Sequence, residues 1–569
     1  MFKFKNILNN EGEVTHIETS LSGHDLLDMP KLNKGGAFTQ EERDLFGLTG
    51  LLPHQVETLD QQVARMYVQY HEHHSNLGKN IYLNVLHDYN ETLFYKLASQ
   101  HLEEMLPIIY TPTVGEAVQR FSLEHRKPKG LIISYCDRHK IGQILENRLP
   151  PEVDLTVVTD GEAVLGIGDQ GIGGINISSA KLMVYSLCGG INPNRVLPIQ
   201  LDVGTNNPHL LNDPMYLGWR HERISGQEYD DFVDSFVSIL IKKFPHIMLH
   251  WEDVGRENAR KLLNRYRDKI LTLNGDIQST GVVALACVLA GVHASSLALR
   301  DQRIVILGAG AAGVGIADQI YATMLRSGLS EQDARSRFWL IDKPGLLTED
   351  ASLLSFQAPY ARSRKDVEGW KLRDANYIGL YDVVKNIKPT ILIGCSTVAG
   401  AFNEEIVKTM AANVERPIIM PLSNPNSLAE AKPEDLLKWT EGKAIIATGS
   451  PFPDVLYNEK WYRIAQSNNA LAFPGIGLGA IVSKAKRLTD DMLWAATEAL
   501  AACSPVIQDK MAPLLPKLAE AKMVSASVAL AVAEQARKEG LAQIPDDVNL
   551  KELIKKSMWE PKYYPYRKG

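Results

Sequence analysis

Three acidic side chains in the middle of the chain have the type and spacing of a metal site. Glu252 and Asp253 follow one expected strand and Asp276 follows the next, within residues 249–280. Parallel strands joined by a helix place their carboxyl ends on one edge of a sheet, where α/β proteins bind ligands. Because these oxygen ligands have few histidines or cysteines nearby, they suit Mg²⁺ or Mn²⁺ better than zinc. The alternative is that Glu252 and Asp253 cap the helix that follows them.

A glycine-rich turn later in the chain has the spacing of a dinucleotide-binding loop. An expected strand at 303–307 runs into the sequence GAGAAG and then into a helical pattern. Such glycines permit a tight turn and bring a pyrophosphate close to the helix N-terminus. The next strand ends in Asp342, an acid that would bond the adenosine ribose and repel a 2′-phosphate, although Lys343 weakens this preference for NAD over NADP. The candidate cofactor-binding residues of the loop are Gly308, Gly310, Ala311 and Gly313.

Two further residues could exchange protons, and each also has an ordinary structural interpretation. Tyr110 lies in residues 108–115, which Pro112 and Gly115 interrupt, so the pattern predicts a loop there. A tyrosine in such a loop could act as acid or base or simply pack. Lys181 stands early in an otherwise small or apolar helix, where loss of water would favour an uncharged amine. A lone lysine is nevertheless more often a surface residue.

The elements around these residues indicate two α/β units behind a helical region. Residues 1 to about 125 read as mostly helical, with Pro53 opening one helix. Strands and helices then alternate to residue 280, which predicts a largely parallel sheet, and a second α/β unit starts near 281. Amphipathic helices are expected at 490–502 and 522–538. The aromatic, basic tail 561–568 is expected to be an arm or a docking segment.

The composition is that of a soluble globular protein of about three or four domains. The net charge of −6 gives no reason to expect nucleic acid or a membrane surface as partner. Five scattered cysteines indicate a reducing compartment rather than a disulfide framework. Since the N-terminus lacks a signal-like run and the longest apolar run, 282–292, is shorter than a membrane span, we expect a cytoplasmic protein.

Ordered motifs over nearly the whole chain resemble the malic enzyme family. They include YTPTVG at 110–115, VVTDGE at 157–162, LGIGDQGIGG at 165–174, ILGAGAAG at 306–313 and NNALAFPGIGLG at 468–479. The resemblance implies an α/β fold with a helical N-terminal domain, a parallel-sheet substrate domain and an inserted Rossmann-like NAD domain. The expected boundaries are 1–125, 126–280 with 468–540, 281–467, and a tail at 541–569. A homodimer or homotetramer is also implied.

The resemblance assigns roles to individual residues and an activity to the chain. It implies oxidative decarboxylation of L-malate, a small-molecule substrate, to pyruvate and CO₂ with NAD and either Mn²⁺ or Mg²⁺. Gln357 stands where NAD-preferring members carry glutamine. The remaining implied roles are metal ligands for Glu252, Asp253 and Asp276, general base for Lys181, general acid for Tyr110, and contacts to substrate and nicotinamide for Asn424, Asn468 and Asn469.

This chain departs from the family pattern near the implied site. Ala163 stands where members carry an arginine that grips the substrate carboxylate, Gly275 replaces the first of two paired aspartates, and Ser279 replaces a glycine. Losing a charged clamp can cost roughly 2–5 kcal/mol when the partner charge is buried. Malolactic enzymes, which convert malate to lactate with NAD retained, also lack that arginine and share LHWEDVGREN with this chain. The alternatives to malic enzyme activity are therefore malolactic activity, an altered substrate, or a homologue that binds without turnover.

Overall fold

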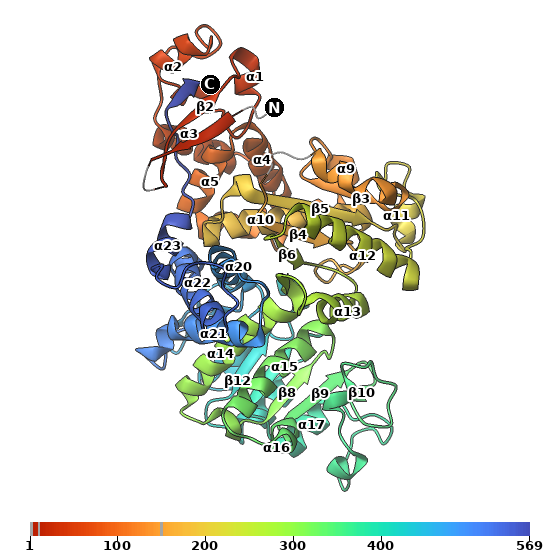
Figure 1. Cartoon of the computed structure of the whole chain (residues 1–569). Helices are drawn as coiled ribbons and strands as arrows, with labels where there is room; N and C mark the ends of the chain where they lie inside the picture. Colours follow the sequence, from red (N-terminus) through yellow and green to blue (C-terminus); the bar gives the residue numbers. More distant parts are fainter. Residues whose placement is uncertain (1–3, 10–11, 148–151) are drawn as a thin grey trace.

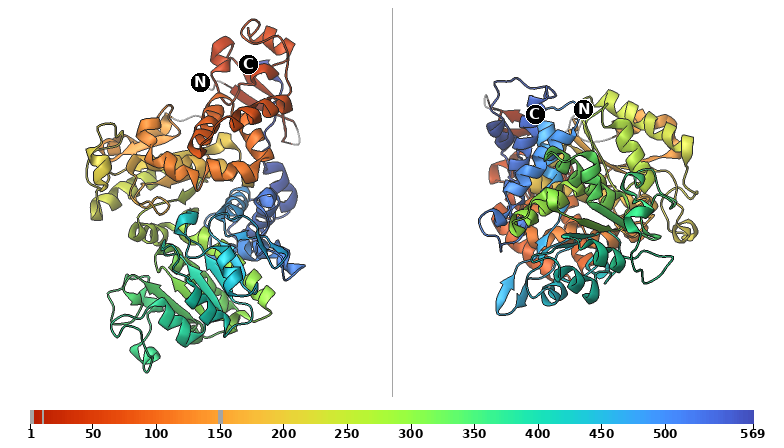
Figure 2. Two further views of the ribbon diagram at one scale, coloured as in Figure 1. Left: turned by 180° about the vertical axis from the view of Figure 1, so that it is seen from behind. Right: turned by 90° about the horizontal axis from the view of Figure 1, so that it is seen from below.

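The computed structural model describes residues 4–9, 12–147 and 152–569. In Figure 1 the N-terminal helices lie at the top, one α/β region lies beside and below them, and a second α/β region forms the lower end. The C-terminal helices run along one side, and the last strand returns to the top, next to β2 (Val14–Thr19). The same order is visible from behind in Figure 2. The last strand is therefore packed against the N-terminal region.

The N-terminal region is helical, as expected, but its helix boundaries differ from the predictions. Pro53 does not open a helix, because the nearest one starts at Leu59, where Thr58 accepts a hydrogen bond from the Gln61 N–H and completes a capping box. Tyr110 does lie in a loop, as predicted, but the loop is shorter than residues 108–115, since only residues 110–112 separate two helices. Pro112 sits at an N-cap and Gly115 within the first turn, positions where helices tolerate both residues. The helices are α1 (Gly23–Leu27), α2 (Gln40–Leu45), α3 (Leu59–His71), α4 (Asn76–Tyr89), α5 (Glu91–Gln100), α6 (Leu102–Ile109), α7 (Thr113–Gln119) and α8 (Phe121–Glu124).

A small sheet that the sequence did not predict joins the two ends of the chain. β1 (Phe4–Leu8) pairs antiparallel with β2, and β17 (Tyr566–Lys568) adds parallel to β2. Tyr566 is buried, and its hydroxyl donates to the Leu32 carbonyl at 2.9 Å. The aromatic tail is thus a docking segment, and it packs against the N-terminal region of the same chain.

The first large sheet is entirely parallel and buried on both faces. Its order is β3-β5-β4-β6-β7, so β6 and β7 are neighbours at one side of the sheet. Leu155 and Val157 of β4 pack towards α10, whereas Val158 packs with α12 on the opposite face. The strands are β3 (Leu131–Ser134), β4 (Leu155–Thr159), β5 (Val196–Asp202), β6 (Met248–Trp251) and β7 (Thr272–Asn274), and the helices are α9 (Ile141–Glu146), α10 (Ile175–Gly189), α11 (Pro208–Asn212), α12 (Gly226–Lys243) and α13 (Arg256–Tyr266).

The second large sheet has the order β10-β9-β8-β11-β12-β13-β16, parallel except at the β10 edge. The strand–glycine turn–helix unit lies inside this sheet, where β8 pairs with both β9 and β11. A separate hairpin joins β14 (Val455–Tyr457) to β15 (Lys460–Tyr462). The sheet strands are β8 (Ile304–Leu307), β9 (Phe338–Asp342), β10 (Gly345–Leu346), β11 (Ile391–Gly394), β12 (Ile418–Pro421), β13 (Ile445–Thr448) and β16 (Ala465–Gln466), and the helices are α15 (Ala311–Arg326), α16 (Glu331–Ser336), α17 (Leu380–Ile387), α18 (Glu404–Ala411) and α19 (Pro433–Trp439).

An apolar helix connects the two sheets. A π-helical turn, η5 (Gly275–Ser279), follows β7 and leads directly into α14 (Thr280–Ser295). By length and composition the stretch Gly275–Ser295 could cross a membrane, but 83% of its most apolar window is buried inside the molecule. We therefore interpret it as a core helix. It runs from the first sheet into the side of the second.

The C-terminal helices close over α10 of the first sheet. α20 (Phe473–Val482) approaches α10 so closely that a Cβ on Gly477 would lie 2.7 Å from the Tyr185 ring. The expected helices at 490–502 and 522–538 are present as α21 (Asp490–Ala502) and α22 (Ala521–Lys538), followed by α23 (Leu550–Ser557). The exact domain boundaries given above remain predictions.

Candidate active site

Seven of the residues predicted for the site line one cavity between the two large sheets, whereas Lys181, Asp342, Gln357 and the predicted residues of the glycine turn are not part of its lining. The cavity has a volume of about 230 Å³ and is bounded by residues that follow β6 and β7 on one side and β11, β12 and β13 on the other. Both sheets thus present the carboxyl ends of parallel strands to the same space. The predicted residues that line it are Tyr110, Glu252, Asp253, Asp276, Asn424, Asn468 and Asn469.

The three acids converge as their spacing suggested. One carboxylate oxygen from each of Glu252, Asp253 and Asp276 lies within 4.8 Å of the others. The Asp253 N–H donates to Asp276 Oδ2 at 3.0 Å, which locks the loop after β6 to the turn after β7. The capping alternative is wrong, because the N-cap of α13 is Gly255 and no side chain caps it.

The donor set fits a hard divalent cation. Asp253 Oδ2 is buried and has no hydrogen-bond partner among the described residues, so it is available as a ligand atom. Burial and then the charge of Asp276 raise the pKa of Asp253 well above its usual value, and burial and then the charge of Glu252 raise the pKa of Asp276 to about 7. These carboxyl groups repel one another when ionised. A divalent cation would stabilise their ionised forms.

Lys181 and Tyr110 lie against the same acids. Lys181, on α10, is fully buried, so its interpretation as a surface residue is wrong. Its Nζ donates to Glu252 Oε1 at 2.5 Å and to the Tyr110 hydroxyl at 3.2 Å, and that hydroxyl donates to the same Glu252 oxygen at 3.1 Å. Burial, with the charge of Glu252 added to it, raises the pKa of Tyr110 well above its usual value. Tyr110 therefore retains its proton near neutral pH.

A histidine that sequence reasoning missed completes this group. His250 Nε2 lies 2.8 Å from Glu252 Oε2, and its Nδ1 lies 2.6 Å from the Tyr185 hydroxyl. Burial opposes ionisation of Glu252, but the charge of Lys181 and the hydrogen bond from His250 outweigh burial and bring the pKa of Glu252 to about 2. The spacing could have revealed this contact, since residues two apart on a strand share a face.

The absence of a side chain at Gly275 is required by these contacts. A Cβ built there would lie 1.8 Å from Glu252 Oε2 and 2.5 Å from His250 Nε2. The volume of the aspartate that the family pattern places at this position is therefore partly occupied by Glu252 and His250.

The glycine turn has the shape needed to receive a pyrophosphate. Gly308 has a φ of +100°, and a Cβ on it would lie 2.3 Å from the Cys395 carbonyl oxygen. A Cβ on Gly313 would lie 2.0 Å from the Gly308 carbonyl oxygen. Gly310 is the N-cap of α15, which begins at Ala311, and no side chain caps the helix. The first N–H groups of the helix are thus left for a ligand.

Asp342, which was predicted to bond the ribose, and Gln357, which was assigned to NAD preference, lie next to this turn. Gln357 Nε2 donates to Asp342 Oδ2 at 3.1 Å and to the Ala309 carbonyl at 2.8 Å. Asp342 and Gln357 therefore form one corner, at the end of β9. Arg256, which the sequence reasoning missed, approaches from the first sheet: its guanidinium carbon lies 3.7 Å from the position of a Cβ on Gly310.

The far wall of the cavity is neutral. Asn424 accepts a hydrogen bond from the Ser450 hydroxyl, and Asn468 Oδ1 accepts one from the Ala470 N–H at 2.9 Å. Ala163 is half-buried, and its N–H donates to the Asp253 carbonyl at 3.1 Å. Within the described part of the chain, the cavity lining includes no arginine or lysine. No side chain there therefore replaces the arginine that the family pattern places at position 163.

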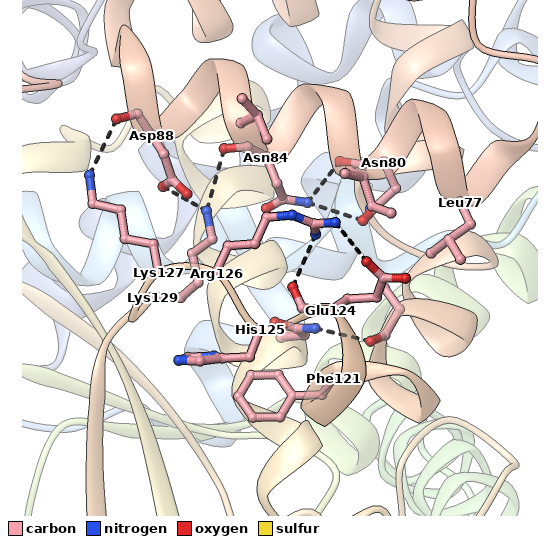
Figure 3. A pocket seen from close by; sticks show the side chains of 14 residues that line it. Leu77, Asn80, Asn84, Asp88, Phe121, Glu124, His125, Arg126, Lys127 and Lys129 are labelled. Carbon is pink, nitrogen blue, oxygen red and sulfur yellow. Dashed lines mark hydrogen bonds and ion pairs between the residues drawn. The ribbon is translucent and has the colours of Figure 1, made fainter. Parts of the chain in front are cut away.

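A second cavity, of about 70 Å³, lies between α4 and residues 121–129 (Figure 3). Its charged groups are paired with one another: Lys129 Nζ lies 2.7 Å from Asp88 Oδ1, and Arg126 lies 2.8 Å from Glu124. Figure 3 also shows the hydrogen bonds between Asn84 and Asn80. None of the predicted site residues lines this cavity. We therefore assign the chemistry to the cavity of about 230 Å³ between the two large sheets.

Comparisons with known proteins agree with this arrangement. The family description "Malic enzyme, N-terminal domain" matches residues 87–267, and "Malic enzyme, NAD binding domain" matches residues 277–537. The chain is 52% identical over 565 residues to "NAD-dependent malic enzyme 3" of Bacillus subtilis, covering 98% of this chain and 99% of that protein. It is 50% identical over 548 residues to the "NAD-dependent malic enzyme" of Acinetobacter baylyi, covering 96% and 97%.

Solved structures show the same fold at lower identity. The malic enzyme of Entamoeba histolytica is 22% identical with a TM-score of 0.56, covering 90% of this chain and 91% of that one. The malic enzyme of Pyrococcus horikoshii is 23% identical with a TM-score of 0.54, covering 80% and 88%. The family resemblance and the α/β fold class are thereby confirmed. This chain belongs to the malic enzyme family.

Proposed function

We propose that this protein catalyses the NAD- and divalent-metal-dependent oxidative decarboxylation of L-malate to pyruvate and CO₂. The observation that carries the proposal is the single cavity in which the three acids and Tyr110, with Lys181 bonded directly behind them, face the sheet that holds the glycine turn. The reaction balances as malate and NAD⁺ giving pyruvate, CO₂ and NADH. The relatives at about half identity carry the same activity in their names.

The acids would hold the cation and the substrate against it. Glu252, Asp253 and Asp276 would provide the protein oxygens, with Asp253 Oδ2 free to act as a ligand. A bound Mg²⁺ or Mn²⁺ supplies Lewis acidity at the substrate oxygens. Asn424, Asn468 and Asn469 would orient the substrate and the nicotinamide through neutral hydrogen bonds.

Lys181 and Tyr110 would move the protons. In its neutral form, Lys181 would accept the hydroxyl proton of malate as hydride leaves C2 for NAD⁺. After loss of CO₂, Tyr110 would donate its proton to C3 of the enolate, a role consistent with its raised pKa. Because Lys181 Nζ lies 3.2 Å from the Tyr110 hydroxyl, the proton taken by the lysine can return to the tyrosine. The two steps then leave the enzyme unchanged.

The test is the product balance of the purified protein. With malate, NAD⁺ and Mn²⁺ we expect pyruvate and NADH in equal amounts, measured by chromatography and by NADH absorbance. Lactate without net NADH would establish the malolactic alternative, which the names of the relatives do not favour. Binding of NAD without turnover of malate or any other 2-hydroxy dicarboxylate would indicate a non-catalytic homologue.

We also propose a cytoplasmic homodimer or homotetramer. The family resemblance supports the assembly, and five free cysteines are consistent with a reducing compartment. Light scattering on the purified protein measures the assembly, and a fluorescent fusion measures the location.

A further inference from the structure

Glu252 is held from both sides by different neighbours. Its Oε1 accepts hydrogen bonds from Lys181 and Tyr110, and its Oε2 lies within hydrogen-bond distance of His250. Because the Glu252 carboxylate accepts hydrogen bonds from Lys181 and Tyr110 on its other oxygen, it acts as an acceptor, and His250 Nε2 must carry the proton that it donates. His250 Nδ1 is then an acceptor, and the Tyr185 hydroxyl donates to it at 2.6 Å. A directed chain of hydrogen bonds therefore runs from Tyr185 through His250 to Glu252.

The packed rings of His250 and Tyr185 leave the Glu252 carboxylate little freedom to move. His250 and Tyr185 are fully buried, and both pack edge-to-face with the Phe473 ring of α20. His250 also lies on β6, between parallel neighbours, so its backbone cannot shift without breaking the sheet. If the Glu252 carboxylate turned away from His250, its contacts to Lys181 and Tyr110 through the other oxygen would change as well.

We propose that His250, supported by Tyr185, is a positioning residue that fixes the carboxylate plane of Glu252 for the cation and for Lys181, and that glycine at position 275 leaves the room this contact needs. The inference rests on the proposed function, because it concerns the ligand set of that site. Hydrogen-bonding partners of metal ligands orient them, and their removal typically weakens metal affinity about 10- to 100-fold. A histidine that served only as core packing would change stability instead.

The decisive measurement is Mn²⁺ binding to the full chain. The binding is monitored through the electron paramagnetic resonance signal of free Mn²⁺. We expect His250→Leu to weaken Mn²⁺ binding about 10- to 100-fold while NAD affinity stays unchanged. His250→Gln places an amide donor near the Nε2 position and should recover most of the lost affinity. His246→Leu, a change at an exposed histidine just before the same strand, is the matched control and should bind Mn²⁺ like the unaltered protein.

A second pair of variants tests the room at position 275. Gly275→Ala puts a methyl group against Glu252 and His250, so it should also weaken Mn²⁺ binding at least about 10-fold. Gly142→Ala is the matched control, since a Cβ there meets only Ile239 at 3.9 Å. This pair decides the question if His250→Leu does not fold.

The outcomes separate the inference from the function on which it rests. Unchanged Mn²⁺ affinity in folded His250→Leu or Gly275→Ala, or a glutamine variant as weak as the leucine one, overturns the positioning role alone. Failure of the unaltered protein to bind Mn²⁺ overturns the proposed function and the positioning role together.

Discussion

The two edges that face the active-site cavity use opposite kinds of chemistry. The edge after β6 and β7 presents buried charged side chains, whose positions depend on one another through Glu252. The facing edge belongs to the second sheet, whose strand β8 runs into the glycine turn beside the cavity, and that turn presents backbone, because glycines remove the side chains that would block a ligand. A site built from backbone tolerates few substitutions of its glycines. A site built from side chains can keep its arrangement when one contacting residue is replaced by another. Gly275 and His250 illustrate such an exchange: where the family pattern has an acid, this chain has a histidine contact.

The largest expected effect isolates the charged edge. Lys181→Ala removes the proposed base and should lower kcat about 10²- to 10⁴-fold, since positioned proton transfer contributes that range. NAD affinity should stay unchanged, because Lys181 contacts Glu252, Tyr110 and the Phe473 ring, all of which lie away from the glycine turn. Steady-state kinetics with calorimetric NAD titration measures both, with Lys140→Ala at an exposed position as control. Equal losses in kcat and NAD affinity would contradict the separation of the two edges.

Next in size is the loss of a metal ligand. Asp276→Asn replaces a charged oxygen by a neutral one and should weaken Mn²⁺ binding by at least about 10-fold, the lower bound seen even for outer contacts of metal sites. The Asp253 N–H keeps an acceptor, so the loop should remain in place. Equilibrium dialysis against Mn²⁺ measures the change. Unaltered binding would move the metal site away from the three acids.

The charged edge should also make stability depend on pH in the metal-free protein. Since the pKa of Asp276 is raised in the folded chain to about 7, its contribution is present below its unfolded value and is lost as pH rises towards 7. Mn²⁺ should reverse this loss, so the increase in Tm on adding Mn²⁺ should be larger at about pH 8 than at about pH 5. Ligand at 100 times its Kd stabilises by about 2.7 kcal/mol. Scanning calorimetry with and without chelator measures the difference, and an equal increase at both values would oppose the account.

A smaller effect should follow from restoring the missing clamp. Ala163→Arg adds a cation near a cavity whose described lining has none, and should lower KM for malate by roughly tenfold, a change of about 1.4 kcal/mol. Ala163→Gln, similar in reach but neutral, is the control. A KM that rises with arginine would mean that another group already holds the substrate carboxylate.

The smallest effect concerns the contact between the two edges. Arg256 reaches from the charged edge to the glycine turn, so Arg256→Gln should weaken NAD several-fold, on the order of 1 kcal/mol for an exposed charged contact, and reduce the salt dependence of binding. Arg260→Gln on the same helix, which pairs with Asp318 at 2.9 Å, should leave NAD binding unchanged. Identical behaviour of the two variants would exclude a direct role for Arg256.

Sequence patterns predicted the parts of this molecule that depend on local spacing. The unit β6–α13–β7 and the turn between β8 and α15 both follow from strand and helix periods and from glycines. The sheet formed by β1, β2 and β17 was not predicted, because its strands are short and partly exposed, and because β17 pairs with β2 across almost the whole chain. The loop that contains Tyr110 is shorter than predicted, because Pro112 and Gly115 are both tolerated at helix starts.

Most members of the candidate site were predicted, but His250, Arg256 and the connections between the side chains were not. The acids and Lys181 come from separate elements, and only the fold shows that Lys181 meets Glu252 rather than solvent. His250 was overlooked because a single histidine on an apolar strand is usually a core residue. Its significance depends on Gly275, which is next to it only across the β6–β7 pair.

The most direct test is a crystal structure of the protein with Mn²⁺ and NAD, using the anomalous scattering of manganese to locate the ion. We expect one anomalous peak within bonding distance of Glu252, Asp253 and Asp276, with the pyrophosphate at the turn of Gly308 to Gly313 and the nicotinamide in the same cavity. A manganese peak elsewhere, or NAD bound away from that turn, would contradict the proposed site.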